Sequence, residues 1–173
     1  DTSATNVTIC DYYEDADGNL YKIVAIETGT MSQSTISGDA LENVYIIGNN
    51  LDAIPDYAFM GNQTLTNVII SDSVKTIGVH AFACCRNLEE IQIPSSITSL
   101  DWSTFEETKW MEDRKAENPL VVVNNILLTY DRTSDATEVT IPEGVTTIPS
   151  NVFVNCSNLE TINIPNSVTT IMG

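Results

Sequence analysis

The chain contains one histidine, His80, near two adjacent cysteines, Cys84 and Cys85, and these are the first residues to consider for catalysis or metal binding. A Ser-His-Asp type site needs a histidine as its base, and structural zinc sites are built from cysteine and histidine ligands. Three potential ligands clustered on one short turn do not supply the tetrahedral set of a structural zinc site. We therefore expect neither a catalytic role for His80 nor a bound metal or cofactor.

The acidic stretch from Asp15 to Asn19 imitates the opening of a calcium-binding loop. Such a loop has glycine at its sixth position and glutamate at its twelfth, where this chain has Leu20 and Ile26. We interpret Asp17-Gly18 as the tight turn of a β-hairpin instead. Carboxylate pairs for glycoside hydrolysis can be drawn among 24 acidic residues, but sequence spacing does not give their separation in space. No enzyme activity is predicted.

Composition and charge restrict the class of partner. Hydrophobic residues make up 42% of the 173-residue chain, as in a folded protein. The formal net charge of −17 repels phosphate backbones and anionic membrane surfaces. The longest apolar run, Pro119 to Leu128, is interrupted by two asparagines and is too short for a spanning helix. We expect no nucleic-acid partner and no membrane insertion.

The elements that carry these residues come from a repeated pattern of 23 residues. Three copies begin at Ile54, Ile77 and Ile148, and six apolar positions recur in each copy. A fixed period of 20 to 30 residues with apolar residues at constant offsets is typical of a solenoid, in which each coil covers its neighbour. The other recurring sets are Phe59, Phe82 and Phe153; Leu65, Leu88 and Leu159; Val68, Ile91 and Ile162; Ile70, Ile93 and Ile164; Val74, Ile97 and Val168.

Each copy predicts one strand and one helical turn. Ile91 and Ile93 alternate with the polar Glu90 and Gln92, as in a strand with one buried face, and Pro94 ends that strand. The segment from His80 to Arg86 has the spacing of a short helical turn. Stacked in parallel, such coils form an α/β solenoid with strands on the concave face and helical turns on the other.

An insertion is expected between Leu100 and Thr147, where only the two ends of the segment follow the pattern. Residues 104–118 have the composition of a longer helix with a threonine cap and glutamate in the first turn. Residues 120–130 read as two strands around the turn Asn124-Asn125. We therefore expect a helix and hairpin insertion at about residues 104–130, inside the solenoid.

The first 50 residues are expected to form an N-terminal cap and the first half-coil. Tyr45, Ile47 and Leu51 align with Val68, Ile70 and Val74, which gives the half-coil. Residues 7–26 alternate on both sides of the Asp17-Gly18 turn, which predicts a β-hairpin. A solenoid needs a cap over its open end. The remaining residues, 51–173, form the solenoid proper, and the chain reads as a piece of a longer protein.

The four cysteines are best explained as free thiols. Cys85 and Cys156 occupy equivalent positions three residues after Phe82 and Phe153, where a small buried hydrophobic residue is expected. Adjacent Cys84 and Cys85 cannot bridge each other without strain. The sequence leaves the disulfide state of Cys10 and Cys84 open.

At this point the residues resemble the BspA-like leucine-rich repeat family, the 23-residue Treponema pallidum type. The stretches "AFACCRNLEEIQIPSSITSL", "VFVNCSNLETINIPNSVTTI" and "EVTIPEGVTTI" carry the resemblance, which covers Leu51 to the end. It implies a bacterial secreted or cell-surface protein, non-enzymatic, that binds host proteins, other bacteria or polymers. We expect a monomer at the cell surface with a protein or glycan partner. The alternative is a structural spacer that displays a neighbouring domain, such as a docking module of a larger surface or cellulosomal protein.

Candidate binding residues lie between the inward positions of each strand, because these face outward on the concave side. Stacked at roughly 4.8 Å, they predict a continuous, mostly polar and mildly acidic sheet that also includes Val44 and Ile46. Trp102 is a possible aromatic contact to a sugar or protein, although it and Trp110 could instead pack under the insertion. The candidates are Asn67, Ile69, Glu90, Gln92, Glu138, Thr140, Thr161 and Asn163.

Overall fold

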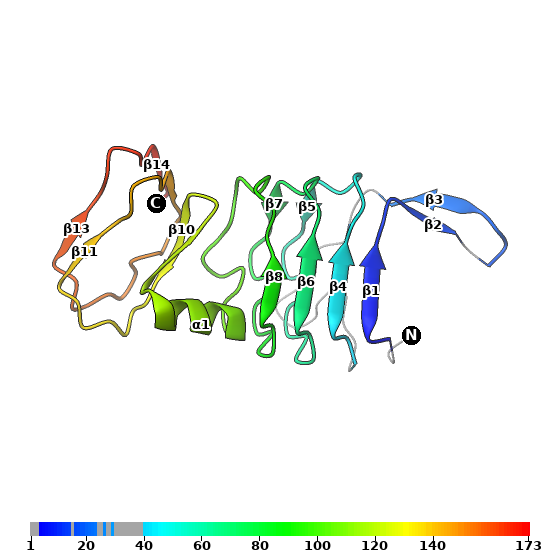
Figure 1. The fold of residues 1–173 in the computed structure, drawn as a ribbon, viewed down its shortest axis with the longest axis horizontal. Coiled ribbons are helices and arrows are strands. Elements are labelled where there is room, and N and C mark those ends of the chain that lie inside the picture. The colour runs from blue at the N-terminus through cyan, green and yellow to red at the C-terminus, as the bar shows by residue number, and fades with distance from the viewer. Residues whose placement is uncertain (1–3, 15, 24–25, 27–28, 30–39) are drawn as a thin grey trace.

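The computed structural model of the chain describes residues 4–14, 16–23, 26, 29 and 40–173. They form an elongated solenoid in which short parallel strands of successive coils lie side by side along the long axis (Figure 1). Asn67 pairs with Glu90 and Glu138 pairs with Thr161, and both spacings equal the period of 23 residues. The expected solenoid of parallel strands is confirmed.

The elements are mostly strands of two to five residues, with one nine-residue helix among the described residues. Their bounds are β1 (Asn6–Ile9), β2 (Tyr12–Glu14), β3 (Leu20–Lys22), β4 (Asn43–Ile46), β5 (Ala53–Ile54), β6 (Asn67–Ile70), β7 (Thr76–Ile77), β8 (Glu90–Gln92), α1 (Lys109–Glu117), β9 (Leu120–Val123), β10 (Ile126–Tyr130), β11 (Glu138–Thr140), β12 (Thr147–Ile148), β13 (Thr161–Asn163) and β14 (Thr170–Ile171).

The strands occupy two sides of the coils. The front side carries two sheets, with strand orders β1-β4-β6-β8 and β11-β13, and corresponds to the face expected to be concave. The second side carries the sheets β5-β7 and β14-β12-β10-β9. The remaining side consists of turns, which the sequence predicted as helical turns.

Those turns are not helices. In the coil that begins at Ile77, the amide of Ala83 donates to the His80 carbonyl at 3.1 Å and the amide of Cys85 donates to the Phe82 carbonyl at 3.3 Å. Each bond closes a single turn. His80 (φ 53°), the first residue of the first turn, and Cys84 (φ 60°), inside the second turn, adopt left-handed backbone conformations. Left-handed residues interrupt a right-handed helix, so the turn side stays a series of separate turns.

A column of stacked phenylalanines forms the centre of the solenoid. Phe59, Phe82 and Phe105 are 0% exposed, and successive ring centroids lie 5.1 and 5.8 Å apart. Offset stacking at such distances stabilises aromatic pairs beyond the burial of their area. The repeated phenylalanine therefore has a structural explanation, because each ring covers the ring of the preceding coil.

Neighbouring coils approach most closely where a glycine faces an aspartate. An added Cβ at Gly78 would lie 2.7 Å from the Pro55 carbonyl carbon and would also meet the Asp56 carboxylate. The same carboxylate accepts a hydrogen bond from the Val79 amide at 2.7 Å. Gly48 makes a similarly close contact with Asp11, at the corner of the coil that follows the front strand β4. Only glycine leaves room for this bond between coils.

The insertion consists of α1 followed by the antiparallel hairpin β9–β10, within the expected range. The N-cap of α1 is Thr108, whose hydroxyl accepts from the Met111 amide at 3.2 Å, so the helix begins at Lys109 and not near Thr104. Residues 104–107 belong to the repeat instead, with Phe105 in the core. The hairpin turn is Asn124-Asn125, with φ of 47° and 66°, as a type I′ turn requires.

The register predicted for the first half-coil was wrong by one residue. Val44 pairs with Val68 and Ile46 pairs with Ile70, and both Val44 and Ile46 are 0% exposed, whereas Ile47 is 55% exposed. The loop that follows β4 holds one extra residue, where the Asn50 amide donates to the Asp11 carboxylate at 2.9 Å. Because residues 44–47 are all apolar or aromatic, alternation alone could not distinguish the two registers.

The N-terminal hairpin is shorter than expected. Tyr12 pairs with Lys22 and Glu14 with Leu20 around Gly18 (φ 82°), which gives the predicted turn. Residues Asn6–Ile9 are not part of the hairpin, because they form β1 and pair in parallel with β4. The hairpin projects beyond β1 along the long axis (Figure 1). Asp15, the first residue of the calcium-like stretch, lies outside the described residues.

Residues of the hairpin β9–β10 belong to two separate core clusters. The larger cluster runs from β1 to the hairpin and includes Val121, Val123 and Leu128. The smaller cluster lies in the last coils and includes Leu127 and Tyr130. Alternate residues of one hairpin therefore pack into both halves of the solenoid.

We predict that Gly78→Ala destabilises the protein by roughly 2–3 kcal/mol, because the new methyl group forces two coils apart at the Asp56 carboxylate. The measurement is the urea midpoint of unfolding.

The matched control is Gly61→Asn. Gly61 (φ 77°) has nothing within 4 Å of an added Cβ, and Asn155 (φ 60°) stands at the same repeat position. We expect a change within about 0.5 kcal/mol for this control. Equal effects of the two substitutions would show that close approach at Gly78 is not the constraint.

Candidate binding face

The front face is defined here as the outward-facing residues of β1, β4, β6, β8, β11 and β13. Inward and outward positions alternate along each strand: Val68 is 0% exposed and Val139 is 9% exposed, whereas Glu90, Gln92, Glu138 and Thr140 are exposed. All eight candidate residues lie at outward positions. They are Asn67, Ile69, Glu90, Gln92, Glu138, Thr140, Thr161 and Asn163.

The front face is not continuous, contrary to the prediction. The candidates on β6 and β8 belong to one sheet and those on β11 and β13 belong to another. Helix α1 takes the place of the next strand after β8, and the Trp110 amide donates to the Leu88 carbonyl at 2.7 Å. The insertion therefore divides the face into two polar patches of four candidates each.

Polar side chains of the front face form hydrogen bonds along the stacking direction. The Asn43 amide nitrogen Nδ2 donates to Asn6 Oδ1 at 2.8 Å. In the second patch, Asn163 Nδ2 donates to Glu138 Oε1 at 2.7 Å and contacts Thr140 Oγ1 at 3.2 Å. Sequence reasoning missed Asn6 and Asn43, because the pairing of β1 with β4 and the register of β4 were not recognised.

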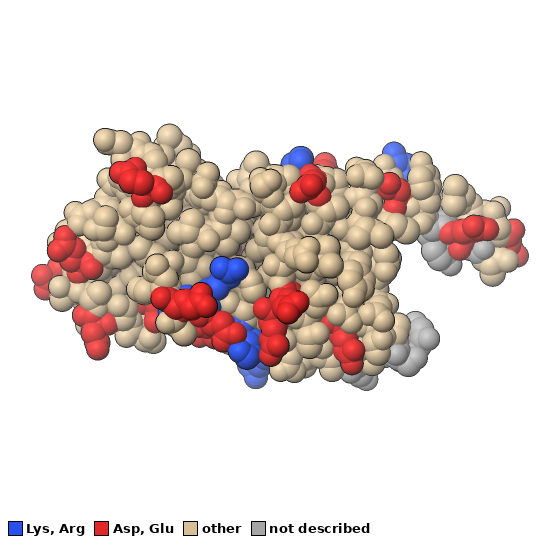
Figure 2. Space-filling model, viewed as in Figure 1, with Lys and Arg blue, Asp and Glu red and all other residues tan. Residues whose placement is uncertain are grey.

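Charge on the front side is mixed only around the insertion. Figure 2 shows acidic side chains scattered over this side, whereas most of its basic side chains gather over α1. Two ion pairs lie within the helix, Lys109 with Asp113 at 2.6 Å and Lys115 with Glu112 at 3.0 Å. Such exposed pairs contribute little to stability, so the basic groups of α1 matter mainly for the local charge of the face.

Trp110 packs under the insertion, as one of the two alternatives proposed. It is 6% exposed, its ring centroid lies 5.0 Å from that of Phe105, and the Arg114 guanidinium carbon lies 4.3 Å from the indole centroid. Trp102 is only half-buried, and Arg132 stacks on it at 4.9 Å. Trp102 thus keeps partial exposure but has a cation on one face.

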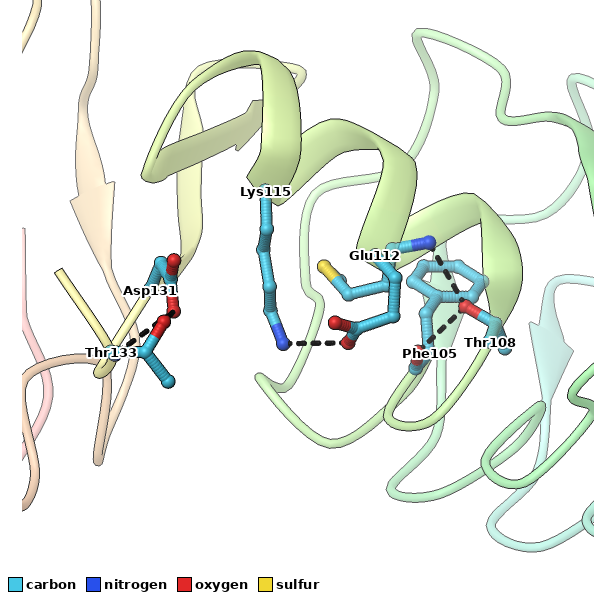
Figure 3. A network of polar contacts seen from close by, with 7 residues as sticks. Phe105, Thr108, Glu112, Lys115, Asp131 and Thr133 are labelled. Atoms are coloured by element: carbon cyan, nitrogen blue, oxygen red, sulfur yellow. Dashed lines mark hydrogen bonds and ion pairs between the residues drawn. The ribbon is translucent and has the colours of Figure 1, made fainter.

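Trp102 borders a pocket of about 400 Å³ between α1 and the segment that follows β10. Figure 3 shows Lys115 extending from the helix with its ammonium group turned toward Glu112, while Asp131 and Thr133 lie on its other side. The Asp131 carboxylate accepts from the Thr133 hydroxyl at 2.8 Å. Glu112, Lys115, Asp131 and Thr133 are therefore already paired within the protein, whereas the buried Tyr130 hydroxyl beside the same pocket has no hydrogen-bond partner among the described residues.

His80 has a structural role. Its ring stacks on Tyr57 at a centroid distance of 5.5 Å, and Nδ1 lies 3.8 Å from Glu106 Oε2. Among the described residues, no group of three or more His, Cys, Asp or Glu side chains is placed to hold a metal ion. Within the same residues, no helix is long and apolar enough to cross a bilayer.

The cysteines are free, and their burial differs. Cys85 is 0% exposed and its Sγ lies 3.1 Å from the Phe59 carbonyl oxygen, as a hydrogen-bond donor. Burial raises the pKa of its thiol to about 12. Partial burial, reinforced by Glu107, also raises the pKa of Cys84. Cys156, expected to be buried like Cys85, is only half-buried because the last coil has no neighbour over it in the structure.

We predict that the protein loses stability as the pH rises above 9, because of Cys85. The unfolded thiol releases its proton near 9.0, whereas the folded thiol keeps it until about 12. The stabilisation is complete below pH 9 and disappears as the pH approaches 12. Urea unfolding at pH 9 and 10.5 should show a fall of roughly 1–2 kcal/mol. Cys85→Ala should remove this part of the pH dependence; an unchanged slope would contradict the assignment.

Comparison with known proteins identifies the repeat. The family model for the BspA type leucine rich repeat region matches residues 29–126 and 124–173, in six copies. A search of curated proteins gives no match.

Solved structures show a distant likeness. The pneumococcal vaccine antigen PcpA is 14% identical, with 99% of this chain and 57% of that chain covered and a TM-score of 0.43. The T. pallidum leucine rich repeat protein is 17% identical, with coverage of 95% and 83% and a TM-score of 0.44. A leucine rich cell surface protein from Faecalibacterium prausnitzii is 16% identical, with coverage of 98% and 66% and a TM-score of 0.30. This chain therefore spans little more than half of the pneumococcal chain.

The matched residues include the coils on both sides of the insertion. By that match, the chain belongs to the BspA-type leucine-rich repeat family.

Proposed function

We propose that this protein is a non-enzymatic, extracellular binding module that presents its front face to a protein or glycan partner. The observation that carries the proposal is the pair of polar patches on β6–β8 and β11–β13, held in register by the repeat. Their side chains stand on strands about 4.8 Å apart, on coils tied together by backbone hydrogen bonds. Such a surface meets a large partner with little loss of conformational freedom.

The extracellular location rests on the family resemblance, because it implies a secreted or cell-surface protein. The formal net charge of −17 supports a partner other than nucleic acid or an anionic membrane surface. The protein acts as a monomer in this proposal, and affinity is spread over both patches.

A second function, that of a structural spacer, is favoured by the elongated shape of the stacked coils (Figure 1). In this alternative the front face is merely solvated, and the solenoid displays a neighbouring domain.

The test is a binding screen of the purified protein against mucins, plant polysaccharides and extracellular matrix proteins. The variant Glu90→Lys, Gln92→Lys, Thr161→Lys changes both patches and raises the net charge by four. We expect this variant to bind any partner found at least tenfold more weakly. The three added lysine cations have no matching groups on the partner, and unmatched charges oppose binding at a polar interface.

The control carries the same charge change on another side of the coils, as Asp52→Lys, Ser99→Lys, Thr170→Lys. All three of these residues are exposed. Equal losses in the two variants would indicate a non-specific charge effect. Absence of any binding by the folded protein would favour the spacer function.

A further inference from the structure

The front sheet β1-β4-β6-β8 ends part-way along the solenoid, at strand β8. Strand β8 is the last strand in the order β1-β4-β6-β8, so one of its edges has no strand partner. An unpaired edge is a template for an added strand. In this solenoid the edge exists because α1 begins where the next front strand would lie and leads away from β8 (Figure 1).

The two ends of this edge are closed by the insertion, but its middle is open. At one end the Trp110 amide donates to the Leu88 carbonyl at 2.7 Å, and at the other Asn124 Nδ2 donates to the Pro94 carbonyl at 2.6 Å. Between these bonds lies a pocket of about 370 Å³ bordered by Ile91, Gln92 and Ile93 of the β8 edge and by α1 and the hairpin. These three edge residues, of which Gln92 is exposed and Ile91 and Ile93 are half-buried, match the length of a short extended segment at roughly 3.3 Å per residue.

One cation faces this pocket. Arg114 is the only charged residue among the described residues that border it, and the others are apolar or uncharged polar. Its guanidinium carbon lies over the Trp110 ring, 4.3 Å from the ring centroid, and the side chain forms none of the ion pairs found among the described residues. Glu117 and Glu143 border the neighbouring pocket on the other side of Arg114 without an ion pair to it. A stacked guanidinium is oriented for bidentate contact with a carboxylate.

We propose that the β8 edge binds an extended peptide segment that carries a carboxylate. The segment adds a short strand to β8, so that its backbone pairs with the groups of Ile91 and Ile93, and its carboxylate pairs with Arg114. Its flanking aliphatic side chains pack on the half-buried Val122 of the hairpin, which borders the same pocket. This is strand addition, in which backbone bonds provide affinity and side-chain pockets provide selectivity. The inference rests on the proposed binding function and names a protein rather than a glycan as partner.

The experiment is an NMR titration of the ¹⁵N-labelled full chain with the blocked peptide acetyl-Thr-Val-Glu-Val-Thr-amide. We expect saturable shifts of the Ile91, Gln92 and Ile93 amides. Two altered peptides separate the contributions: replacement of the central glutamate by glutamine removes the charge, and N-methylation of the central residues removes backbone donors. Each should weaken binding by roughly ten- to hundredfold.

Arg114→Gln should lower the affinity for the glutamate peptide to the affinity measured for the glutamine peptide. The affinity for the glutamine peptide itself should not change. The matched control is Arg86→Gln, which removes the same charge from an exposed residue paired with Glu107 at 2.8 Å on the turn side. Both variants are first checked for unchanged spectra of the core amides, because both side chains are exposed.

Two outcomes would overturn the inference: no shifts at β8 with millimolar peptide, or binding that is indifferent to both N-methylation and Arg114→Gln. Either result would leave the proposed function standing if the screen of extracellular polymers still finds a partner sensitive to the front-face variant. Failure of that screen together with saturable peptide binding would instead limit the binding function to the β8 edge.

Discussion

The structure depends on the contact between one coil and the next. A single coil of this repeat has one short front strand and one or two apolar rings, too little to form a core alone. Stacking provides what the coil lacks, because Phe82 is covered by Phe59 on one side and Phe105 on the other. Backbone hydrogen bonds on all sides of the coil set the spacing of these rings, and the glycine at position 78 allows the closest approach.

The insertion is the exception to this regularity, and it is where the surface becomes chemically distinct. By replacing a front strand with α1, the chain interrupts its own ladder and leaves the edge of β8 open. The same helix brings Lys109, Arg114 and Lys115 to the front side of a protein with a net charge of −17. Regular coils therefore supply rigidity, whereas the irregular one supplies most of the local variation in shape and charge.

The fold could be predicted from the sequence because apolar residues recur at fixed offsets and the strand side alternates cleanly, as at Ile91 and Ile93. The register of β4 could not, because residues 44–47 are uniformly apolar or aromatic and either alternation fits. The helix was predicted, but its start at Lys109 and its position in place of a strand depend on a tertiary bond between Trp110 and Leu88. The stacking of Arg114 on Trp110 and of Arg132 on Trp102 is likewise a contact that spacing alone does not reveal.

The hairpin β9–β10 affects how cooperatively the protein unfolds. Its alternate residues belong to two separate core clusters, Val121 and Val123 to one and Leu127 and Tyr130 to the other. In a chain of nearest-neighbour contacts, cooperativity passes only through the interfaces between units. The hairpin forms most of that interface here, beside the contact of Arg132 with Trp102, so it couples two folding units mechanically. Melting of either half removes one side of the packing that holds the hairpin, and the loss is transmitted through the hairpin to the other half.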